Sequence, residues 1–479
     1  MSVPSHYLVI IPGFMGSKLR DKETGEFVWV NLSSLPPNPF EWEVWLDRML
    51  TRLKYPNDAL EAVDVMDEVI FVSPWAKQEH YVRLLEMLEG MGYKVNPTKY
   101  SEQERNVYSF PYDWRQDNRK SAVQLGEAIE HWNSYHPGAK AWIIAHSNGG
   151  LVARWYIEKL GGKERVERLF LMGSPWDGTP KAMVVLTDGL DTLFRRRFNI
   201  FDIPQQTREV MRTFPCAYQL IPTNSQFLRD SYGKMVDPFT NSLWLDTQKE
   251  KQYLSDALSF NQELGKTSSI ETICFFGRKN STTSGGIVSF GAGDVWKKIE
   301  WEKIELGDGT VPEHSAVFPE AKSSYPFSAS HGDIYVNSAV LDVLEWELFG
   351  KFHVAKRAIL VNERIAVISQ MERDAYKPGE WIPIHFLVNE SKDDRRPISG
   401  AQVRFQMVWR QPLPGNRNRF SARIPLGAVL TESKEVPGSY HGSIEAPLDE
   451  GYYEIRTAVT IRGQSPVLLS EMVIVEAVE

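Results

Sequence analysis

The stretch at residues 141–157, AWIIAHSNGGLVARWYI, decides the fold of this 479-residue chain. It begins with a continuous apolar run, which is typical of a strand buried on both faces of a parallel sheet. It ends in a segment with helical periodicity. Ser147 stands at the junction, with the small residues Ala145 and Gly149 two positions before and after it. This order predicts a nucleophile elbow, a strand-to-helix turn too tight for larger side chains.

The elbow implies two partner side chains further along the chain. A serine hydroxyl is a weak nucleophile, so it needs a base, and the base needs an acid to hold it. In α/β-hydrolases these residues follow in the order Ser, Asp or Glu, His. Asp308, between two glycines, and His331, just before the last helical pattern of the fold, fit this order. We therefore predict Ser147 as nucleophile, Asp308 as acid and His331 as base.

Other residues compete for these roles. A turn with an incidental serine is the alternative for Ser147, and a solvated loop histidine is the alternative for His331. His314 is a rival base, but it follows the predicted acid very closely. Asp333 is a rival acid in the wrong chain order. His146 neighbours the nucleophile, and its side chain is expected to point away from the elbow.

An oxyanion hole needs two backbone N–H donors near the nucleophile. In this fold one comes from the residue after the serine and one from a loop that follows an early strand. Asn148 is the residue after the serine, and the loop PGFMGS at 12–17 follows an apolar run. We therefore predict donors at Asn148 and Phe14.

Apolar runs and helical patterns alternate through the first part of the chain. Continuous apolar runs at 7–11, 69–72 and 166–172 are typical of strands in a parallel sheet. Helical periodicity fills 80–91 and 122–132. Strands that alternate with helices predict an α/β fold with a mainly parallel sheet, as the elbow does.

The pattern divides the chain into a catalytic domain at 1–357 and a second domain at 358–479. Between about 181 and 300 short apolar pieces alternate with polar stretches, which favours a lid or cap inserted in the catalytic domain. The second domain consists of short β-rich runs separated by turn clusters, which predicts a β-sandwich. Its turn at Lys377-Pro378-Gly379 before a strand resembles bacterial immunoglobulin-like modules.

Composition excludes some classes of function. The chain is 42% hydrophobic and 24% charged, as is usual for a soluble globular protein. Its net charge of -8 argues against nucleic acid as a partner, because phosphate binding needs a basic surface. The charge does not argue against membrane contact, which apolar side chains can provide. No Cys/His cluster suggests a metal site, and we expect neither metal nor cofactor.

The cysteines and the N-terminal segment bear on location. Cys216 and Cys274 do not make a disulfide framework and are expected to be buried, reduced thiols. The first residues lack the basic region and long apolar core of a signal peptide. No apolar run approaches the ~18 residues that a membrane span needs. We expect a cytoplasmic protein, with peripheral membrane contact as an open alternative.

Five segments together resemble the lecithin:cholesterol acyltransferase family, which includes acyltransferases and phospholipases. They are VIIPGFMGS at 9–17, PYDWR at 111–115, the elbow at Ser147, GDGTVP at 307–312, and His331. They stand in the family's order over about residues 7–350. The resemblance implies the same catalytic residues, Ser147, Asp308 and His331, and oxyanion amides at Phe14 and Asn148.

The resemblance also carries limits. It implies a structural role for Asp113 and Arg115, so neither is expected to be catalytic. Secreted members of the family have a signal peptide and disulfides, for which this sequence gives no sign. The C-terminal β-sandwich is not part of the family core, so the resemblance says nothing about its role.

Tryptophans are concentrated in the segment 27–66, where the family carries a small membrane-touching subdomain. Tryptophan favours the membrane interface, so Trp29, Trp42 and Trp45 are predicted to contact lipid, with Met15 as a further substrate contact. Alternatively, these side chains pack on the hydrolase core or line an acyl pocket. The sequence leaves both possibilities open.

Three functions follow from these observations. The first is a phospholipase A or lipase that hydrolyses lipid acyl esters through an acyl-enzyme on Ser147. The second passes the same acyl group to an alcohol instead of water. The third is a non-catalytic protein that uses its β-sandwich for binding, which an intact Ser/Asp/His set disfavours. A lipid hydrolase inside its own cell needs restraint, so we also expect control by the lid, the C-terminal domain or a regulatory protein partner.

Overall fold

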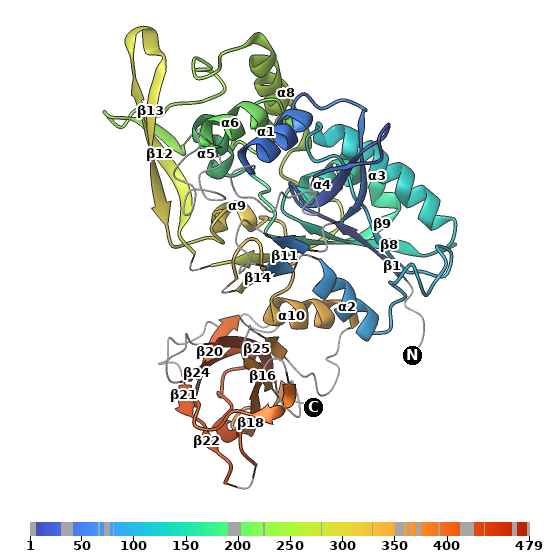
Figure 1. Ribbon diagram of the computed structural model, residues 1–479, viewed down its shortest axis with the longest axis vertical. Coiled ribbons are helices and arrows are strands. Elements are labelled where there is room, and N and C mark those ends of the chain that lie inside the picture. Colours follow the sequence, from blue (N-terminus) through green and yellow to red (C-terminus); the bar gives the residue numbers. More distant parts are fainter. Residues whose placement is uncertain are drawn as a thin grey trace. The chain divides into compact units, whose positions relative to one another are not determined.

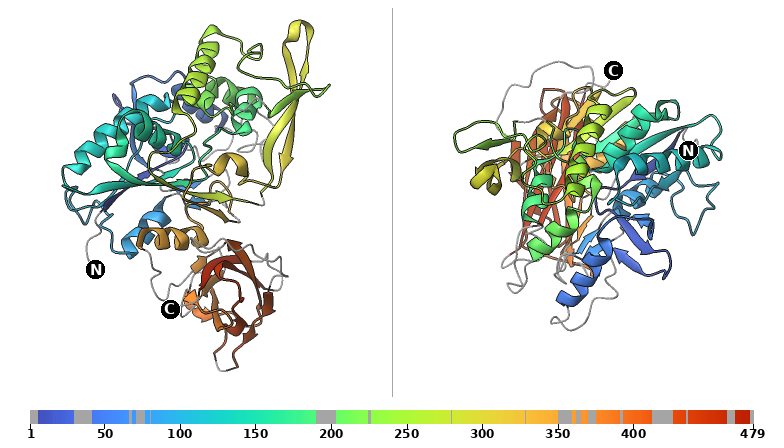
Figure 2. Two further views of the ribbon diagram at one scale, coloured as in Figure 1. Left: turned by 180° about the vertical axis from the view of Figure 1, so that it is seen from behind. Right: turned by 90° about the horizontal axis from the view of Figure 1, so that it is seen from above.

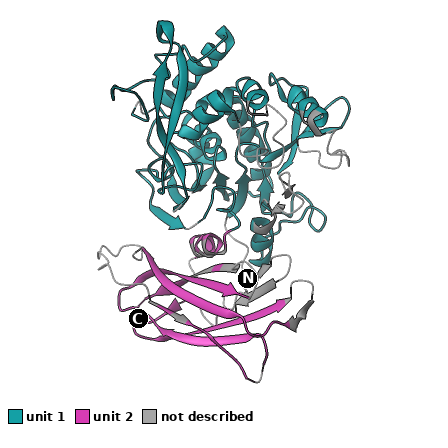
Figure 3. Cartoon of the chain, turned by 60° about the vertical axis from the view of Figure 1, so that its left-hand side comes forward, with its two compact units in different colours: residues 1–336 teal, residues 337–479 magenta. Residues whose placement is uncertain are grey.

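The structure is a computed structural model and divides into two compact units, Met1–Val336 and Asn337–Glu479 (Figure 3). The predicted boundary, at residues 357 and 358, stays a prediction. The residues described are 6–29, 42–65, 68–70, 77–79, 81–189, 203–223, 226–278, 280–327, 329–349, 359–361, 365–369, 375–390, 393–411, 426–434, 436–461 and 467–476.

The first unit is built around a six-stranded sheet in which every pairing is parallel, in the order β14-β11-β9-β8-β1-β7 (Figure 1). This confirms the predicted α/β fold. The strands are β1 (His6–Ile11), β7 (Val107–Ser109), β8 (Lys140–His146), β9 (Val166–Met172), β11 (Glu271–Gly277) and β14 (Ser323–Phe327).

Helices cover both faces of this sheet. On one face lie α3 (Asn118–Asn133) and α4 (Gly149–Lys159), and on the other lies α2 (Val82–Gly90) (Figures 1 and 2). All six residues of β1 are buried, which is why its sequence is continuously apolar instead of alternating. Asp117 begins α3 by accepting a hydrogen bond from the backbone N–H of Arg119. The helical patterns at 80–91 and 122–132 therefore correspond to α2 and α3.

Two sequence predictions for this sheet were wrong. The run at 69–72 was expected to be a buried parallel strand, but β5 (Glu68–Ile70) pairs antiparallel with β6 (Lys77–Glu79) away from the central sheet. The range 181–300 was expected to be a lid or cap, but β11 lies in it and pairs with β14 and β9 inside the central sheet. The cap therefore cannot be the whole of that range, and a lid built from the rest of it stays a prediction.

Smaller elements surround the sheet. A three-stranded sheet of β3 (Phe27–Trp29), β2 (Ser17–Asp21) and β4 (Leu60–Val65) adjoins α1 (Trp42–Leu53). A second one joins β10 (Leu228–Asp230) to the long hairpin of β12 (Thr282–Phe290) and β13 (Trp296–Ile304), which projects from the body of the unit (Figure 2). The remaining helices are α5 (Pro180–Asp188), α6 (Ile203–Met211), α7 (Pro215–Gln219), α8 (Gln248–Leu264) and α9 (Glu313–Ala316).

The second unit contains α10 (Ser338–Phe349) and two β-sheets. Side chains from both sheets, among them Phe386 and Phe405, share one buried core, as in a sandwich. The immunoglobulin-like character of this unit stays a prediction. One sheet contains β15 (Ile359–Val361), β16 (Ile365–Ser369), β18 (Trp381–Glu390), β19 (Asp393–Pro397), β23 (Ser439–Glu445) and β22 (Thr431–Glu432), and the other contains β17 (Ala375–Tyr376), β25 (Val467–Val475), β24 (Gly451–Thr460), β20 (Gln402–Gln411) and β21 (Leu426–Val429).

Both cysteines, Cys216 and Cys274, are free and buried. Among the described residues, no helix has the length and apolar character needed to cross a bilayer. Within the same residues, no group of three or more His, Cys, Asp or Glu side chains is arranged to hold a metal ion.

Candidate active site

Ser147 lies on the turn between β8 and α4, at the carboxyl end of the central sheet. Its backbone is left-handed, with φ of 50°, a conformation that a side chain other than glycine adopts only under constraint. Part of the constraint is the hydrogen bond from the Ser147 N–H to the carbonyl of Met172 at the end of β9, at 3.0 Å. This is the geometry of a nucleophile elbow.

The structure brings the three predicted catalytic residues together. Ser147 Oγ lies 2.9 Å from His331 Nε2, and His331 Nδ1 lies 2.7 Å from Asp308 Oδ2. Gly173, with φ of 58°, lies against this pair, and a Cβ there would be 3.0 Å from Asp308 Oδ2. A serine hydroxyl, an imidazole and a carboxylate in this sequence of contacts can move a proton from the hydroxyl to the imidazole.

Asp308 is held firmly in place. Its side chain accepts hydrogen bonds at Oδ1 from the backbone N–H groups of Thr310 and Val311, at 2.9 and 2.7 Å. Its backbone carbonyl accepts from the N–H of His331 at 2.9 Å. Its second oxygen, Oδ2, faces the imidazole of His331. Because Asp308 is only 2% exposed, water has little access to this contact.

The rival residues lie elsewhere. His314 is exposed on α9. Asp333 accepts a hydrogen bond from Ser330 through Oδ2. Among the described contacts, the hydrogen-bond partner of the Ser147 hydroxyl is His331 and not His146. The Nε2 atom of His146 lies 3.0 Å from the carbonyl oxygen of His331.

The loop after β1 lies directly against the elbow. A Cβ on Gly13 would be 2.8 Å from Ser147 Cβ, so only glycine allows the loop to come this close. The loop turns through a hydrogen bond from the Gly16 N–H to the Gly13 carbonyl, with Met15 at φ of 63°. Within the described residues, the backbone N–H groups of Phe14 and Asn148 have no acceptor in the protein. Both remain available for an oxyanion.

The Asn148 side chain is fixed by residues to which the sequence analysis gave no role in the site. Its Nδ2 donates to Asn118 Oδ1 at 2.9 Å and to the hydroxyl of Tyr112 at 3.1 Å, and its Oδ1 accepts from Asn118 Nδ2 at 3.0 Å. Asn118 begins α3 and Tyr112 lies in the PYDWR motif. These contacts hold the first turn of α4, whose positive dipole end favours negative charge at the elbow.

Asp113 and Arg115 form an ion pair with a structural role. Arg115 is 1% exposed, and its Nε and Nη2 donate to the two carboxylate oxygens of Asp113 at 2.8 and 2.7 Å. Its Nη1 donates to the carbonyl of Leu53 at the end of α1. The pair therefore ties α1 to the loop after β7, and among the described contacts neither residue bonds to a catalytic candidate.

The four residues predicted to contact lipid differ in their surroundings. Trp29 is 6% exposed, donates from Nε1 to the Met15 carbonyl at 3.0 Å, and packs edge-on against Trp114. It is part of the hydrolase core, which is the alternative that the sequence left open. Met15 and Trp45 are partly buried against the same core. The Trp42 side chain lies outside the described residues.

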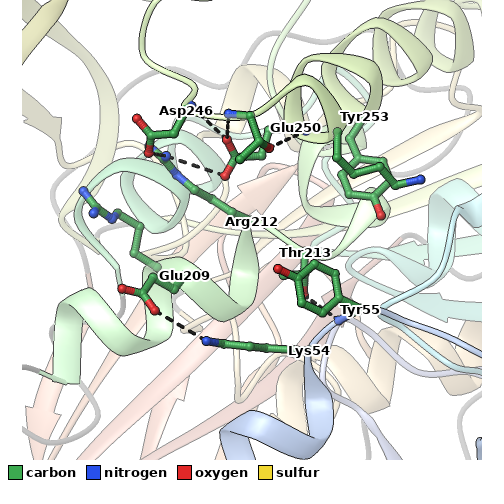
Figure 4. A pocket seen from close by; sticks show the side chains of 11 residues that line it. Lys54, Tyr55, Glu209, Arg212, Thr213, Asp246, Glu250 and Tyr253 are labelled. Carbon is green, nitrogen blue, oxygen red and sulfur yellow. Dashed lines mark hydrogen bonds and ion pairs between the residues drawn. The ribbon is translucent and has the colours of Figure 1, made fainter.

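A polar pocket of about 220 Å³ lies apart from these groups, between the end of α1, α6 and the start of α8 (Figure 4). Most of its charges are paired: Arg212 with Asp246 at 2.6 Å, and Lys54 with Glu209 at 3.4 Å. None of the three catalytic candidates lines it. It is a charged surface hollow and not an extension of the candidate active site.

Comparison with known proteins adds independent evidence. The family model described as lecithin:cholesterol acyltransferase matches residues 53–329. Phospholipase A(1) LCAT3 of Arabidopsis thaliana is 27% identical over 216 residues, which cover 39% of this chain and 46% of that protein. Lysosomal phospholipase A and acyltransferase of Homo sapiens is 24% identical over 250 residues, which cover 45% and 57%. The chain thus spans about half the length of these relatives.

A similar fold is present in the crystal structure of the Tle4-Tli4 complex, with a TM-score of 0.50 and 16% sequence identity over 70% of this chain and 96% of that chain. At this identity the likeness concerns the fold alone. The family model, in contrast, covers more than half of the chain and includes the elbow and the Asp308 loop. This protein belongs to the lecithin:cholesterol acyltransferase family of α/β-hydrolases.

Proposed function

We propose that this protein is a serine hydrolase that cleaves acyl esters of lipids, as a phospholipase A or lipase. The observation that carries the proposal is the continuous chain of contacts from Ser147 Oγ through His331 to Asp308, at 2.9 and 2.7 Å. Family membership supports an ester of a lipid as the substrate. A purely binding role for the fold is not favoured, because it would not require this set of contacts.

In the proposed reaction, His331 Nε2 takes the proton of the Ser147 hydroxyl as Oγ attacks the ester carbonyl carbon. Negative charge moves to the carbonyl oxygen, which the N–H groups of Phe14 and Asn148 stabilise. The tetrahedral intermediate then collapses, and His331 gives its proton to the departing alcohol. Asp308 holds the imidazole in the tautomer with hydrogen on Nδ1 and stabilises its positive charge.

The acyl-enzyme on Ser147 is then open to a second nucleophile. Water, deprotonated by His331, releases a free fatty acid and regenerates the serine. A lipid alcohol in the same place would produce a new ester, and the name of the human relative includes acyltransferase as well as phospholipase. Chromatography of products formed with and without an added lipid alcohol separates these outcomes. An acylated alcohol that dominates over free fatty acid would make transfer the main reaction.

The test of the proposal compares wild type with Ser147→Ala. We expect the substitution to remove labelling by a fluorophosphonate and to lower kcat for a soluble ester by at least about 10⁴-fold, because it removes the hydroxyl that contacts His331 Nε2. Ser174→Ala is the matched control, since Ser174 is also a buried serine beside the elbow, but its hydroxyl donates to the carbonyl of Ala145.

Two results would contradict the proposal. One is a Ser147→Ala variant that keeps the label and the activity of wild type. The other is a wild-type protein that neither reacts with the label nor releases fatty acid from phospholipid or triacylglycerol vesicles. Lipid profiling of cells that express each form would then identify the head group that the enzyme prefers. A cytoplasmic location, peripheral membrane contact and a regulatory protein partner stay predictions.

A further inference from the structure

A second histidine and a tyrosine connect the parts of the candidate active site. The Gly13 N–H donates to the Tyr81 hydroxyl at 2.9 Å. The same hydroxyl lies 2.9 Å from His146 Nδ1, and His146 Nε2 lies 3.0 Å from the carbonyl oxygen of His331. These contacts form an unbroken chain from the oxyanion loop to the backbone of the base.

The two ends of this chain assign its hydrogens. The His331 carbonyl can only accept, so His146 carries a hydrogen on Nε2 and donates there. The Gly13 N–H can only donate, so the Tyr81 oxygen accepts from it. The hydroxyl hydrogen of Tyr81 can then go to His146 Nδ1, which is the acceptor nitrogen of that neutral tautomer. Burial raises the pKa of Tyr81, so its hydroxyl keeps this hydrogen at neutral pH.

The chain joins segments that are far apart in the sequence. Gly13 belongs to the loop after β1, Tyr81 immediately precedes α2, His146 ends β8, and His331 lies in the loop after β14. The His331 backbone is held on both sides, since its N–H donates to the Asp308 carbonyl and its carbonyl accepts from His146.

The connecting side chains are packed as well as hydrogen-bonded. Tyr81 is 2% exposed and His146 is 8% exposed. The ring of Tyr335 stacks on Tyr81 at 4.5 Å between centroids and meets His146 edge-on at 4.5 Å. Neither Tyr81 nor His146 has a hydrogen bond to Ser147 Oγ among the described contacts. Tyr81 and His146 can therefore influence the reaction through the residues that they contact, among them Gly13 and His331.

We propose that Tyr81 and His146 are positioning residues that set the oxyanion loop and the base in register with Ser147. This deepens the proposed function and rests on it. Gly13 is directly before Phe14, whose N–H is the predicted oxyanion donor, so a shift at Gly13 moves that donor. An oxyanion donor is effective only within a narrow range of distance to the developing charge, and small displacements lower the rate strongly.

The first test is Tyr81→Phe, which keeps the ring and removes only the hydroxyl. We expect kcat for a soluble ester to fall about 10- to 100-fold with KM changed by less than about twofold, because substrate binding does not use the oxyanion donors fully until the transition state. Rates are expressed per active site, counted by complete fluorophosphonate titration, so that a loss of folded protein does not enter them. A kcat within about twofold of wild type would overturn the proposal.

Tyr93→Phe is the matched control. Tyr93 is also 2% exposed, and its hydroxyl lies 2.7 Å from His6 Nε2, at the amino end of β1 and away from the elbow. The two substitutions thus remove the same group from the same kind of buried Tyr–His contact. The proposal requires a fall in kcat for Tyr81→Phe that Tyr93→Phe does not show. Equal falls in both would overturn it, because they would report a general effect of burial.

A second set of variants tests separately the two hydrogen bonds of His146, one to Tyr81 and one to the His331 carbonyl. An asparagine amide reaches the place of Nδ1 and a glutamine amide reaches the place of Nε2, so His146→Asn keeps the Tyr81 contact and His146→Gln keeps the His331 carbonyl contact. His146→Phe keeps neither. We expect both amide variants to retain more kcat per active site than His146→Phe. If the kcat of His146→Phe equals that of wild type, or if neither amide variant has a higher kcat than His146→Phe, then Tyr81 and His146 do not position the site.

Failure of this inference and failure of the proposed function give different results. If Ser147→Ala is inactive and Tyr81→Phe is as active as wild type, the hydrolase stands and the positioning role is wrong. If Ser147→Ala is as active as wild type, the hydrolase itself is wrong, and the positioning role falls with it.

Discussion

Asp308 uses its two carboxylate oxygens for two different purposes. Oδ1 accepts from two backbone N–H groups, and Oδ2 faces His331 Nδ1. The first oxygen fixes the orientation of the group, and the second oxygen determines which nitrogen of the imidazole carries hydrogen. A side chain at this position must therefore accept in both directions.

This requirement makes a prediction for Asp308→Asn. An asparagine must place its single oxygen toward the amides of Thr310 and Val311, which leaves its NH₂ group facing His331 Nδ1. The imidazole then turns its hydrogen to Nε2 and cannot accept the proton of Ser147. We expect kcat for a soluble ester to fall by about 10⁴-fold with little change in KM.

The control for that measurement is Asp333→Asn. Asp333 is the rival acid, and in the structure its Oδ2 accepts from Ser330 instead of contacting the base. We expect it to retain the activity of wild type. Loss of activity in Asp333→Asn with Asp308→Asn unaffected would reverse the assignment of the acid.

The sequence predicted some of these residues and missed others for a physical reason. Ser147 stands in a motif whose small neighbours the tight turn requires, and Asp308 and His331 follow it in the chain order of α/β-hydrolases. Tyr81 and Asn118 stand in no such motif, because the residues that they contact come from other parts of the fold. Their roles depend on contacts across the sheet, which no local pattern encodes.

At the scale of elements, β1 connects two different environments. Its carboxyl end leads into the oxyanion loop, while its amino end places His6 in a buried cluster. His6 stacks on Trp142, lies 2.7 Å from the Tyr93 hydroxyl, and is 7% exposed. Burial, with a smaller effect from the charge of Arg168, lowers the pKa of His6 to about 4.

This pKa predicts a pH dependence of stability. Unfolded, His6 takes up a proton as the pH falls below about 6.5, whereas folded it resists protonation until about pH 4. The unfolded state thus binds more protons between these values, so the free energy of unfolding decreases as pH falls from about 6.5 to 4. We expect His6→Gln, whose amide can still accept from Tyr93, to reduce this decrease in urea titrations across the same range.

His314→Gln serves as the control, since His314 is an exposed histidine on α9 and does not belong to the buried cluster of His6. If His6→Gln loses stability on acidification as steeply as wild type does, His6 is not the group responsible.

Strands of the central sheet differed in how well the sequence predicted them. β1, β8 and β9 were recognised because both of their faces are buried, which produces long apolar runs. The run at 69–72 is equally apolar, but Val69 and Ile70 belong to β5, which lies outside the central sheet, since apolar character does not specify the partner strand. β11 was missed because the polar segments before and after it obscured the alternation of strands and helices.

At the scale of the whole molecule, the chain has separate hydrophobic cores. One contains side chains between Tyr7 and Phe318, and another contains side chains between Tyr376 and Val475. All three catalytic candidates lie in the first unit. The chemistry and the folding of the β-sandwich therefore depend on different sets of packed residues.

We predict that the two cores respond separately to substitution. Ile455→Ala, at a fully buried position of β24, should lower the free energy of unfolding of the second unit by about 2–5 kcal/mol and leave kcat for a soluble ester unchanged. Ile129→Ala, equally buried in α3, should affect the first unit by a similar amount. Differential scanning calorimetry should resolve two transitions, each moved by one substitution. A single transition moved by both would show that the units unfold together.

The left-handed backbone at Ser147 has a consequence for selection. A residue other than glycine held at φ of 50° raises the energy of the folded chain by about 1 kcal/mol or more. Glycine would relieve this strain, so a lineage that needed only a folded scaffold would gain stability by replacing the serine. The strain at Ser147 is therefore not required by the fold itself. Ser147, held in a strained turn with a base and an acid aligned behind it, thus serves the proposed acyl transfer at the expense of folding stability.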